Sequence, residues 1–237
     1  MASTNLTELA EALEALGLLV RRPLLPADLA TARVDFDLRA VLPGARGAWV
    51  LGDGGGTFFA GFQAAGRESA DGAPDPLDRY TKRVLGETFA RVLGPQGSTY
   101  ALRFPFGGGR TPLPIAALGT AAGISPAGPL GLQIHPRFGP WWAYRALAVL
   151  AVELPPAPPL ARPCAGCPAP CVAACPGQAV TPQGLQVSRC VCHRLADPGC
   201  HTSCAARLAC VVAPHARYPR EHLAFHMSAS LATIRSA

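Results

Sequence analysis

The sequence lacks several features that would mark large classes of protein. No run of eighteen apolar residues is free of proline, glycine or charge, which argues against a membrane-spanning helix. Charged residues make up only 15% of the chain and hydrophobic ones 49%, a composition that excludes a disordered protein. The first residues show no basic segment followed by an apolar one, so we expect no signal peptide and a cytoplasmic protein.

Cysteine is absent before Cys164 and abundant from there to Cys210, a span that contains all nine. The first four follow the pattern Cys-x2-Cys-x3-Cys-x3-Cys-Pro. Three closely spaced thiolates can hold three corners of an iron–sulfur cube, and a fourth cysteine followed by proline typically serves the other cube. This rule predicts two [4Fe–4S] clusters, the first on Cys164, Cys167, Cys171 and Cys210, and the second on Cys175, Cys190, Cys200 and Cys204. Cys192 is left over.

Zinc binding and disulfide formation are the alternative roles for the cysteines. Zinc also binds Cys-x2-Cys pairs, and His193 and His201 lie among the thiols, although zinc sites usually show two separated pairs. A disulfide framework needs an oxidising compartment, and nine cysteines would leave one thiol unpaired. His222 and His226, four residues apart in the tail, lack a third ligand, so we expect surface or packing histidines there.

The formal net charge of +6 normally suggests nucleic acid or acidic membranes as partners. Eight thiolates add about −8, and two oxidised cluster cores add about +2 each, so the protein with its clusters would be near +2. The basic residues are also dispersed along the chain. We therefore expect neither a nucleic acid nor a membrane as partner.

Strands and helices are mixed before the cysteines. Helical spacing predicts helices over 5–16, 76–88, 113–122 and 219–234. Alternation and apolar runs predict strands over 48–51, 99–106, 130–134 and 142–152. The expected fold class is α+β: an α/β domain over 1–154, a proline-rich linker over 155–163, and a small iron–sulfur domain over 164–237.

Two glycine clusters, Gly52–Gly56 and Gly107–Gly109, follow expected strands. Neither gives Gly-x-Gly-x-x-Gly opening a helix, so a dinucleotide site is not indicated. They are expected to be flexible turns, or places where backbone approaches a large flat ligand.

The order of these features resembles the epoxyqueuosine reductase family. The residues that carry the resemblance are the run CAGCPAPCVAACPGQAV, the downstream Ser-Arg-Cys at 188–190, and Cys200, Cys204 and Cys210. The stretch AAGISPAGPLGLQIHPRFGPW is similar to that family's glycine-rich turn into a strand hairpin, and DPLDRYTKRVL and WVLGDGGG are similar to cobalamin-processing decyanase relatives. The resemblance implies a nitroreductase-like α/β domain that binds cobalamin, followed by a two-cluster ferredoxin-like domain.

This resemblance implies that the clusters pass electrons to a cobalamin or similar cofactor for reductive chemistry on a small-molecule substrate. Polar contacts to that cofactor are expected from Arg79, Tyr80, His135 and Arg145, each of which could equally have an ordinary structural role. The family's acidic proton donor before the hairpin has no evident counterpart, which argues against epoxide chemistry. The alternative is an electron carrier that docks on a redox partner protein and binds no corrinoid.

Overall fold

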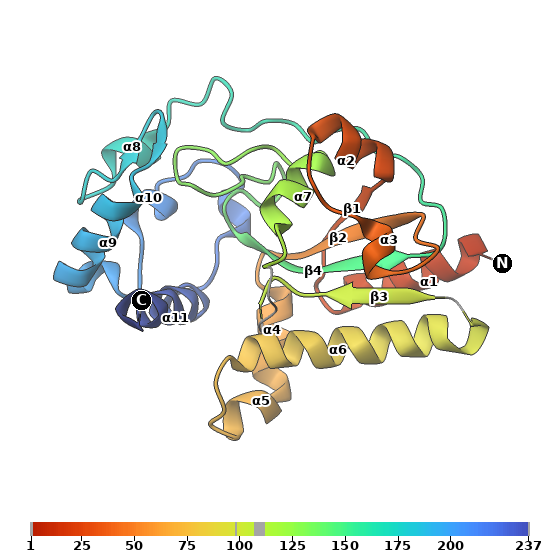
Figure 1. The fold of residues 1–237 in the computed structure, drawn as a ribbon. Helices are drawn as coiled ribbons and strands as arrows, with labels where there is room; N and C mark the ends of the chain where they lie inside the picture. Colours follow the sequence, from red (N-terminus) through yellow and green to blue (C-terminus); the bar gives the residue numbers. More distant parts are fainter. Residues whose placement is uncertain (1, 98, 107–111, 237) are drawn as a thin grey trace. The chain divides into compact units, whose positions relative to one another are not determined.

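The computed structural model describes residues 2–97, 99–106 and 112–236 and divides into two compact units (Figure 1). The first unit contains residues 1–124 and 143–159, and the second contains 125–142 and 160–237. These units differ from the domain ranges expected from the sequence, because segment 125–142 packs with the cysteine-bearing part of the chain. The glycine cluster Gly107–Gly109 lies outside the described residues.

A four-stranded sheet in the order β1-β2-β4-β3 forms the centre of the first unit. Its strands are β1 (Val20–Leu24), β2 (Gly47–Gly54), β3 (Tyr100–Arg103) and β4 (Trp142–Leu150). β1 pairs antiparallel with β2, and β3 pairs antiparallel with β4. Every residue of β2 is buried, and so are the last six of β4, because helices cover both faces of the sheet.

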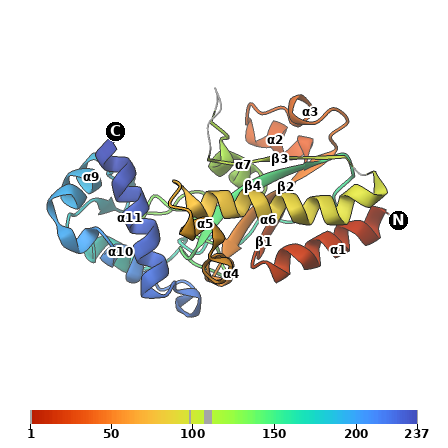
Figure 2. The same cartoon turned by 90° about the horizontal axis from the view of Figure 1, so that it is seen from below.

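The long helix α6 (Pro76–Leu93) runs along one face of the sheet beside α1 (Ala2–Ala15), whereas α2 (Pro26–Ala32) and α7 (Ile115–Ala121) lie on the other face (Figures 1 and 2). Proline at the first position of α6 suits a helix start, since its missing N–H would have no partner there. The buried side chains of α6 recur every three to four residues and form its inner face: Leu77, Tyr80, Val84, Leu85, Phe89 and Val92.

The first glycine cluster is structured rather than flexible. Gly52 and Gly54 belong to β2, and Gly55 and Gly56 turn the chain directly into α4 (Thr57–Ala65). The φ angles of Gly55 and Gly56 are 73° and 100°, a left-handed conformation that favours glycine. The remaining short helices of this unit are α3 (Leu38–Val41), α5 (Arg67–Ala70) and the 3-10 turn η1 (Gly94–Gln96).

The expected helices over 5–16, 76–88, 113–122 and 219–234 are all confirmed in outline. The expected strand over 130–134 is wrong. That segment has only isolated bridges, Ala127 with Gln133 and His135 with Gly139, and it contributes Leu130 and Ile134 to the core of the second unit instead. Burial against the cysteine region, which no local pattern encodes, accounts for its apolar side chains.

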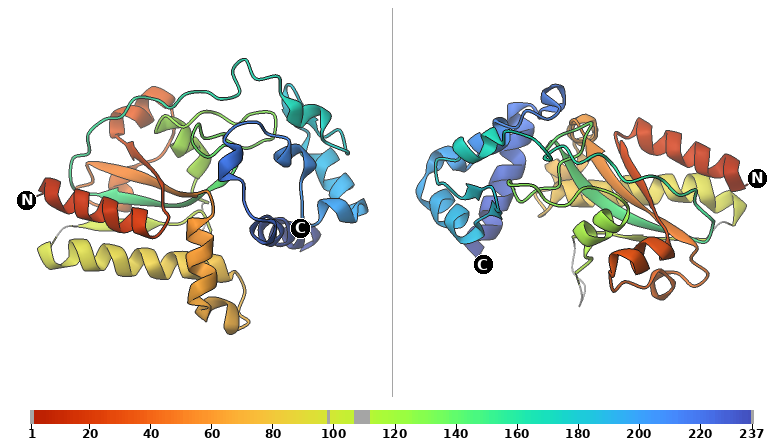
Figure 3. Two further views of the ribbon diagram at one scale, coloured as in Figure 1. Left: turned by 180° about the vertical axis from the view of Figure 1, so that it is seen from behind. Right: turned by 90° about the horizontal axis from the view of Figure 1, so that it is seen from above.

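Short elements make up the second unit. They are α8 (Pro170–Ala173), β5 (Val180–Thr181), β6 (Gly184–Leu185), α9 (Val187–Ala196), η2 (Pro198–Cys200), α10 (Ala205–Leu208), η3 (Pro214–Ala216) and α11 (Arg220–Ser236). The C-terminal helix α11, dark blue in Figure 3, packs against α9. Cys171 and Cys210 themselves belong to the small buried core. No helix within the described residues is long and apolar enough to cross a bilayer.

Candidate metal centres

One cavity of the second unit is lined by four thiols. They belong to Cys164, Cys167, Cys171 and Cys210, the set that spacing assigned to the first cluster. The other wall residues are apolar: Pro129, Leu130, Ile134, Ala169, Pro170, Val211 and Val212. Four thiols in a largely apolar wall, two of them buried and Cys164 exposed, suit a thiolate-bound metal group that lies near the surface of the unit.

Burial and mutual repulsion act together on these thiols. Burial raises the pKa of Cys164, and the neighbouring Cys167, Cys210 and Cys171 raise it further. Burial likewise raises the pKa of Cys171 and of Cys210. These three groups are not easily ionised together without a cation, whose positive charge would offset both penalties.

The second set of cysteines also comes together. Burial is the largest cause that raises the pKa of Cys200. The charges of four neighbours raise it further, in the order Asp197, Cys204, Cys175 and Cys190. Burial also raises the pKa of Cys190, where Arg194 acts in the opposite direction and Cys204 and Cys175 add to the rise. The fold therefore gathers Cys175, Cys190, Cys200 and Cys204 into one group, although they are spread over thirty positions of the sequence.

Cys175 and Cys210 end two copies of the same backbone turn. Cys175 follows the one-turn helix α8, and Cys210 follows the one-turn helix α10, which packs against α8. Three residues after each cysteine the backbone is left-handed, with φ of 49° at Gln178 and 50° at Ala213. Proline follows Cys175 but not Cys210, so the second turn keeps its shape without proline and places Cys210 in the wall of the cavity with four thiols.

Backbone N–H groups are directed at two of the sulfur atoms. The Ala169 N–H donates to Cys167 Sγ at 3.4 Å, and the Ala179 N–H donates to Cys175 Sγ at 3.4 Å. Ala169, which directly precedes α8, has a left-handed backbone conformation with φ of 49°. Hydrogen bonds of this kind stabilise thiolates and tune the potential of a bound cluster.

Arg194 ties three elements around the second set of cysteines. This buried side chain of α9 donates to the Met227 carbonyl at 2.8 Å and to Ser230 Oγ at 3.1 Å, both on α11. It also donates to the Cys200 carbonyl at 3.3 Å. Arg194 therefore fixes the position of η2, which carries Cys200.

We predict that Arg194→Ala lowers the free energy of unfolding by about 2–3 kcal/mol, because it empties a buried position and removes the charged donor of three hydrogen bonds, to Met227, Ser230 and Cys200. Urea denaturation followed by circular dichroism measures the loss. The matched control is Arg189→Ala on the same helix, whose exposed side chain makes one bond, to the Gln178 carbonyl, and which should cost less than about 0.5 kcal/mol. Equal losses would contradict the role given to Arg194.

Histidines adopt two different arrangements near the thiols. His193 Nε2 lies 3.1 Å from Asp197 Oδ2, and together with Cys200 Sγ their ligand atoms all lie within 4.8 Å of one another. This trio is the place where the zinc alternative would use a histidine. His222 and His226 instead contact each other, with Nε2 atoms 3.0 Å apart, and the ring of His222 stacks on Tyr218. Cys192, the spare thiol, is exposed on α9.

Two of the side chains expected to contact a flat cofactor hold the first unit together. Arg79 pairs with Asp71 through both carboxylate oxygens, at 2.6 and 2.7 Å, and donates to the Glu68 carbonyl. Tyr80 is buried and packs edge-on against Phe58 and Phe62, with ring centroids 5.3 and 5.6 Å away. Sequence reasoning placed both on the correct helix but could not see these long-range partners.

The remaining two lie in different units. His135 belongs to the second unit, where its Nδ1 accepts from the Arg137 N–H at 3.1 Å and its backbone pairs with Gly139. Arg145 belongs to the first unit and forms a buried ion pair with Asp53, whose carboxylate also accepts from the Ala143 N–H. The structure therefore does not gather the four predicted contact residues within one unit.

Asp78 is an acidic group that the sequence pattern does not single out. It stands in the first turn of α6 and is half-buried. Burial raises the pKa of its carboxyl most; Arg145 lowers it, Asp75 raises it and Lys82 lowers it by smaller amounts. An aspartate that keeps its proton to higher pH than usual is a candidate proton donor. No sequence signal separates it from an ordinary N-terminal helix acid.

We predict that Asp78→Asn stabilises the protein at neutral pH and has no effect at low pH. With a raised pKa, the folded state binds this proton more tightly than the unfolded chain does. The contribution of Asp78 to stability is thus greatest below the unfolded pKa of about 3.9 and falls as the pH rises through the folded value. Thermal unfolding of both proteins from pH 3 to pH 8 should show curves that converge at low pH; parallel curves would contradict the raised pKa.

Comparisons with known proteins show what the fold is similar to. No family model and no curated protein matches the sequence. Among solved structures, a selenomethionine-labelled epoxyqueuosine reductase matches with a TM-score of 0.61 and 13% identity, over 94% of this chain and 69% of that one. An epoxyqueuosine reductase with a tRNA-Tyr stem loop matches with a TM-score of 0.60 and 12% identity, over 93% and 68%. The B12-trafficking protein CblC from C. elegans matches with a TM-score of 0.60 and 14% identity, over 95% and 91%. The fold is thus similar to both kinds of protein.

Proposed function

We propose that this protein is an iron–sulfur redox protein whose second unit holds two [4Fe–4S] clusters. The observation that carries the proposal is the single cavity lined by Cys164, Cys167, Cys171 and Cys210, three neighbours in sequence and one distant thiol. The matching turn at Cys175 supports the reciprocal arrangement for the second cluster. Zinc would bind a tetrahedral set of thiolates without sulfide. The apolar wall is compatible with zinc, but two interleaved quartets are less typical of zinc sites than of paired [4Fe–4S] clusters.

The chain's own residues would do three things for such clusters. The eight thiolates hold the metal, the apolar wall residues exclude water, and the N–H groups of Ala169 and Ala179 stabilise charge on sulfur. When bound, the clusters supply one-electron transfer. Because both quartets lie in one small unit, electrons have a short path between them.

The fold neighbours include proteins named for epoxyqueuosine reduction and for B12 trafficking, which supports a corrinoid or similar cofactor in the first unit. The side chains Arg79, Tyr80 and Arg145 do not fit this role as they stand, because each is engaged within that unit. A corrinoid would have to be held by different side chains or by backbone. If a reductive reaction on a small substrate takes place here, Asp78 is our candidate for the acid.

Electron paramagnetic resonance of cob(II)alamin mixed with the iron-loaded protein tests this part. Loss of the lower-axial nitrogen coupling means that the corrinoid is bound without its base and supports a corrinoid-dependent reductase. A signal of free cobalamin beside normal signals of the reduced clusters contradicts corrinoid binding and favours the alternative, in which the protein is an electron carrier.

The electron-carrier alternative is favoured by the distribution of charge. The first unit holds thirteen basic and thirteen acidic residues, whereas the second holds eight basic and only two acidic ones, a difference of +6. All nine cysteines and all six histidines also belong to the second unit. The thiolates and cluster cores add about −4, so this unit would remain weakly positive, near +2, when its clusters are bound. A weakly basic electron-transfer unit, in a chain whose first unit is neutral, suits docking of an acidic redox partner protein. The absence of a nucleic-acid partner stays a prediction.

A further inference from the structure

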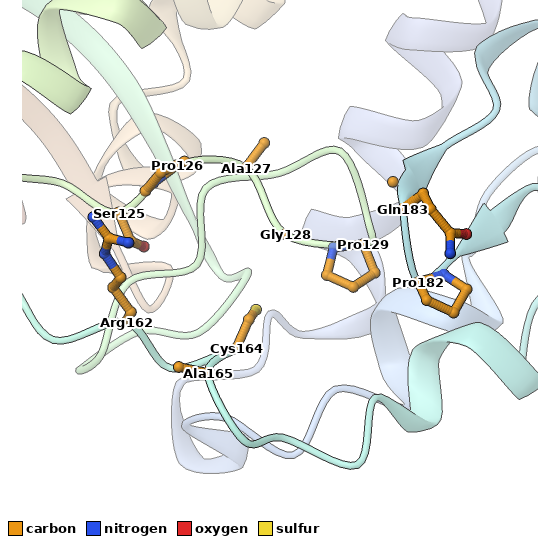
Figure 4. Close-up of a pocket in the computed structure, with 11 residues that line it drawn as sticks. Ser125, Pro126, Ala127, Gly128, Pro129, Arg162, Cys164, Ala165, Pro182 and Gln183 are labelled. Carbon is orange, nitrogen blue, oxygen red and sulfur yellow. The ribbon is translucent and has the colours of Figure 1, made fainter.

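A second cavity of the second unit lies next to Cys164. Its volume is about 350 Å³, and its wall includes Ser125, Gly128, Arg162, Cys164, Ala165 and Gln183. Figure 4 shows the Cys164 side chain pointing into the space between these segments, with Arg162 extending toward Ser125 and Pro126. This is the lower end of the size range of small-molecule sites. A complete corrinoid is too large for it.

The two cavities of this unit share a wall. Cys164 and Pro129 line both the cavity with four thiols and the cavity beside it. The backbone closes in on the shared sulfur, because a Cβ added at Gly128 would come within 2.7 Å of Cys164 Sγ. A molecule in the second cavity would therefore be separated from the metal group by the side chain of Cys164.

The charge of the residues that line the second cavity favours an anionic ligand. Arg162 carries the one charge among the described residues of the cavity wall, and no carboxylate lines it. Ser125 is occupied by its bond to the Ile134 carbonyl, which leaves the guanidinium and the Gln183 amide as polar groups that can face a ligand. With its clusters the unit would be only weakly positive, so the Arg162 guanidinium supplies most of the attraction for an anion at this cavity.

We propose that this cavity binds a small anionic electron acceptor, which takes one electron from the cluster held by Cys164. The inference rests on the proposed function. The reduced cluster loses one electron and the anion gains it; no bond is formed or broken, and no proton moves. The second unit thus has its own exit for electrons, independent of any cofactor in the first unit.

Binding is tested with hexacyanocobaltate(III), a redox-inert trianion, added to the iron-loaded protein in a calorimeter. We expect one site, and about tenfold weaker binding in Arg162→Glu, which corresponds to about 1.4 kcal/mol. The matched control is Arg189→Glu, which changes an exposed arginine of the same unit that does not line the cavity. Its Kd should stay within about twofold of the unaltered protein, by the small effect expected of a remote surface charge.

Electron exit is tested by stopped-flow reoxidation of the reduced protein. Hexacyanoferrate(III) should react more slowly with Arg162→Glu, whereas the cation hexaammineruthenium(III) should not be slowed. Ala165→Phe, which places a large side chain in the cavity, should lower the rate of reoxidation by hexacyanoferrate(III). Ala161→Phe, which lies outside the cavity, should leave that rate unchanged.

The outcomes separate the two proposals because iron is measured first in every sample. Protein without iron contradicts the proposed function and this inference with it. Iron-loaded protein in which Arg162→Glu and Arg189→Glu weaken the anion equally contradicts the inference alone, since binding is then a property of the basic surface.

Discussion

Cys171→Ala is expected to remove half of the iron from the protein. Cys171 is buried, lines the cavity with four thiols and belongs to the core of its unit. Three remaining thiolates leave one corner of a cube unheld, while the other quartet is intact. Iron and acid-labile sulfide, measured on protein reconstituted without oxygen, should both fall to about half.

The same variant should also destabilise the second unit. The buried cluster around Cys171 and Cys210 contains few large apolar side chains, so we expect metal binding to supply much of the folding free energy there. Cys192→Ala is the matched control, because Cys192 is exposed and lies outside both quartets. Its iron content should be unchanged. A halved iron content in Cys192→Ala would show that the assignment of ligands is wrong.

Asp53→Ala is expected to lower the free energy of unfolding by about 3–5 kcal/mol. Asp53 is fully buried at the end of β2, and its Oδ2 lies 3.0 Å from Nη2 of the buried Arg145 on β4. Its Oδ1 accepts from the Ala143 N–H at 2.9 Å. Removing the carboxylate leaves a guanidinium charge in the sheet, above the ring of Phe58, without its counter-ion.

The control for this prediction is another ion pair of the first unit. Arg46 and Glu153 are bridged at 2.6 Å, but their side chains are 59% and 79% exposed, so water competes with the pair. Glu153→Ala should cost less than about 1 kcal/mol. Chemical denaturation of both variants gives the comparison. Similar losses would show that burial does not set the strength of the Asp53 pair.

Local signals account for what could be predicted from the sequence. The two quartets are a prediction from cysteine spacing alone, and α6 was predicted from proline at its start and an apolar face at helical spacing. Strand β1 was missed, since Arg21, Arg22 and Pro23 interrupt the apolar pattern. It is an edge strand, where proline is tolerated, and Arg21 lies over the ring of Trp49.

Long-range packing accounts for the rest. The residues near Asp53 in the sequence do not predict its ion pair with Arg145, which is ninety-two positions away. The segment 125–142 reads like part of the preceding α/β domain, yet its apolar residues complete the cavity around the thiols. The proline rule alone would have favoured Cys175 over Cys210 as a distant ligand, whereas the backbone shows that both turns are alike.

The content of iron and acid-labile sulfide, together with the electron paramagnetic resonance spectrum of the dithionite-reduced protein, tests the central claim most directly. The account predicts about eight iron and eight sulfide per chain, and a signal broadened by coupling between two reduced [4Fe–4S] clusters. Stoichiometric zinc without sulfide, and no signal on reduction, would contradict it.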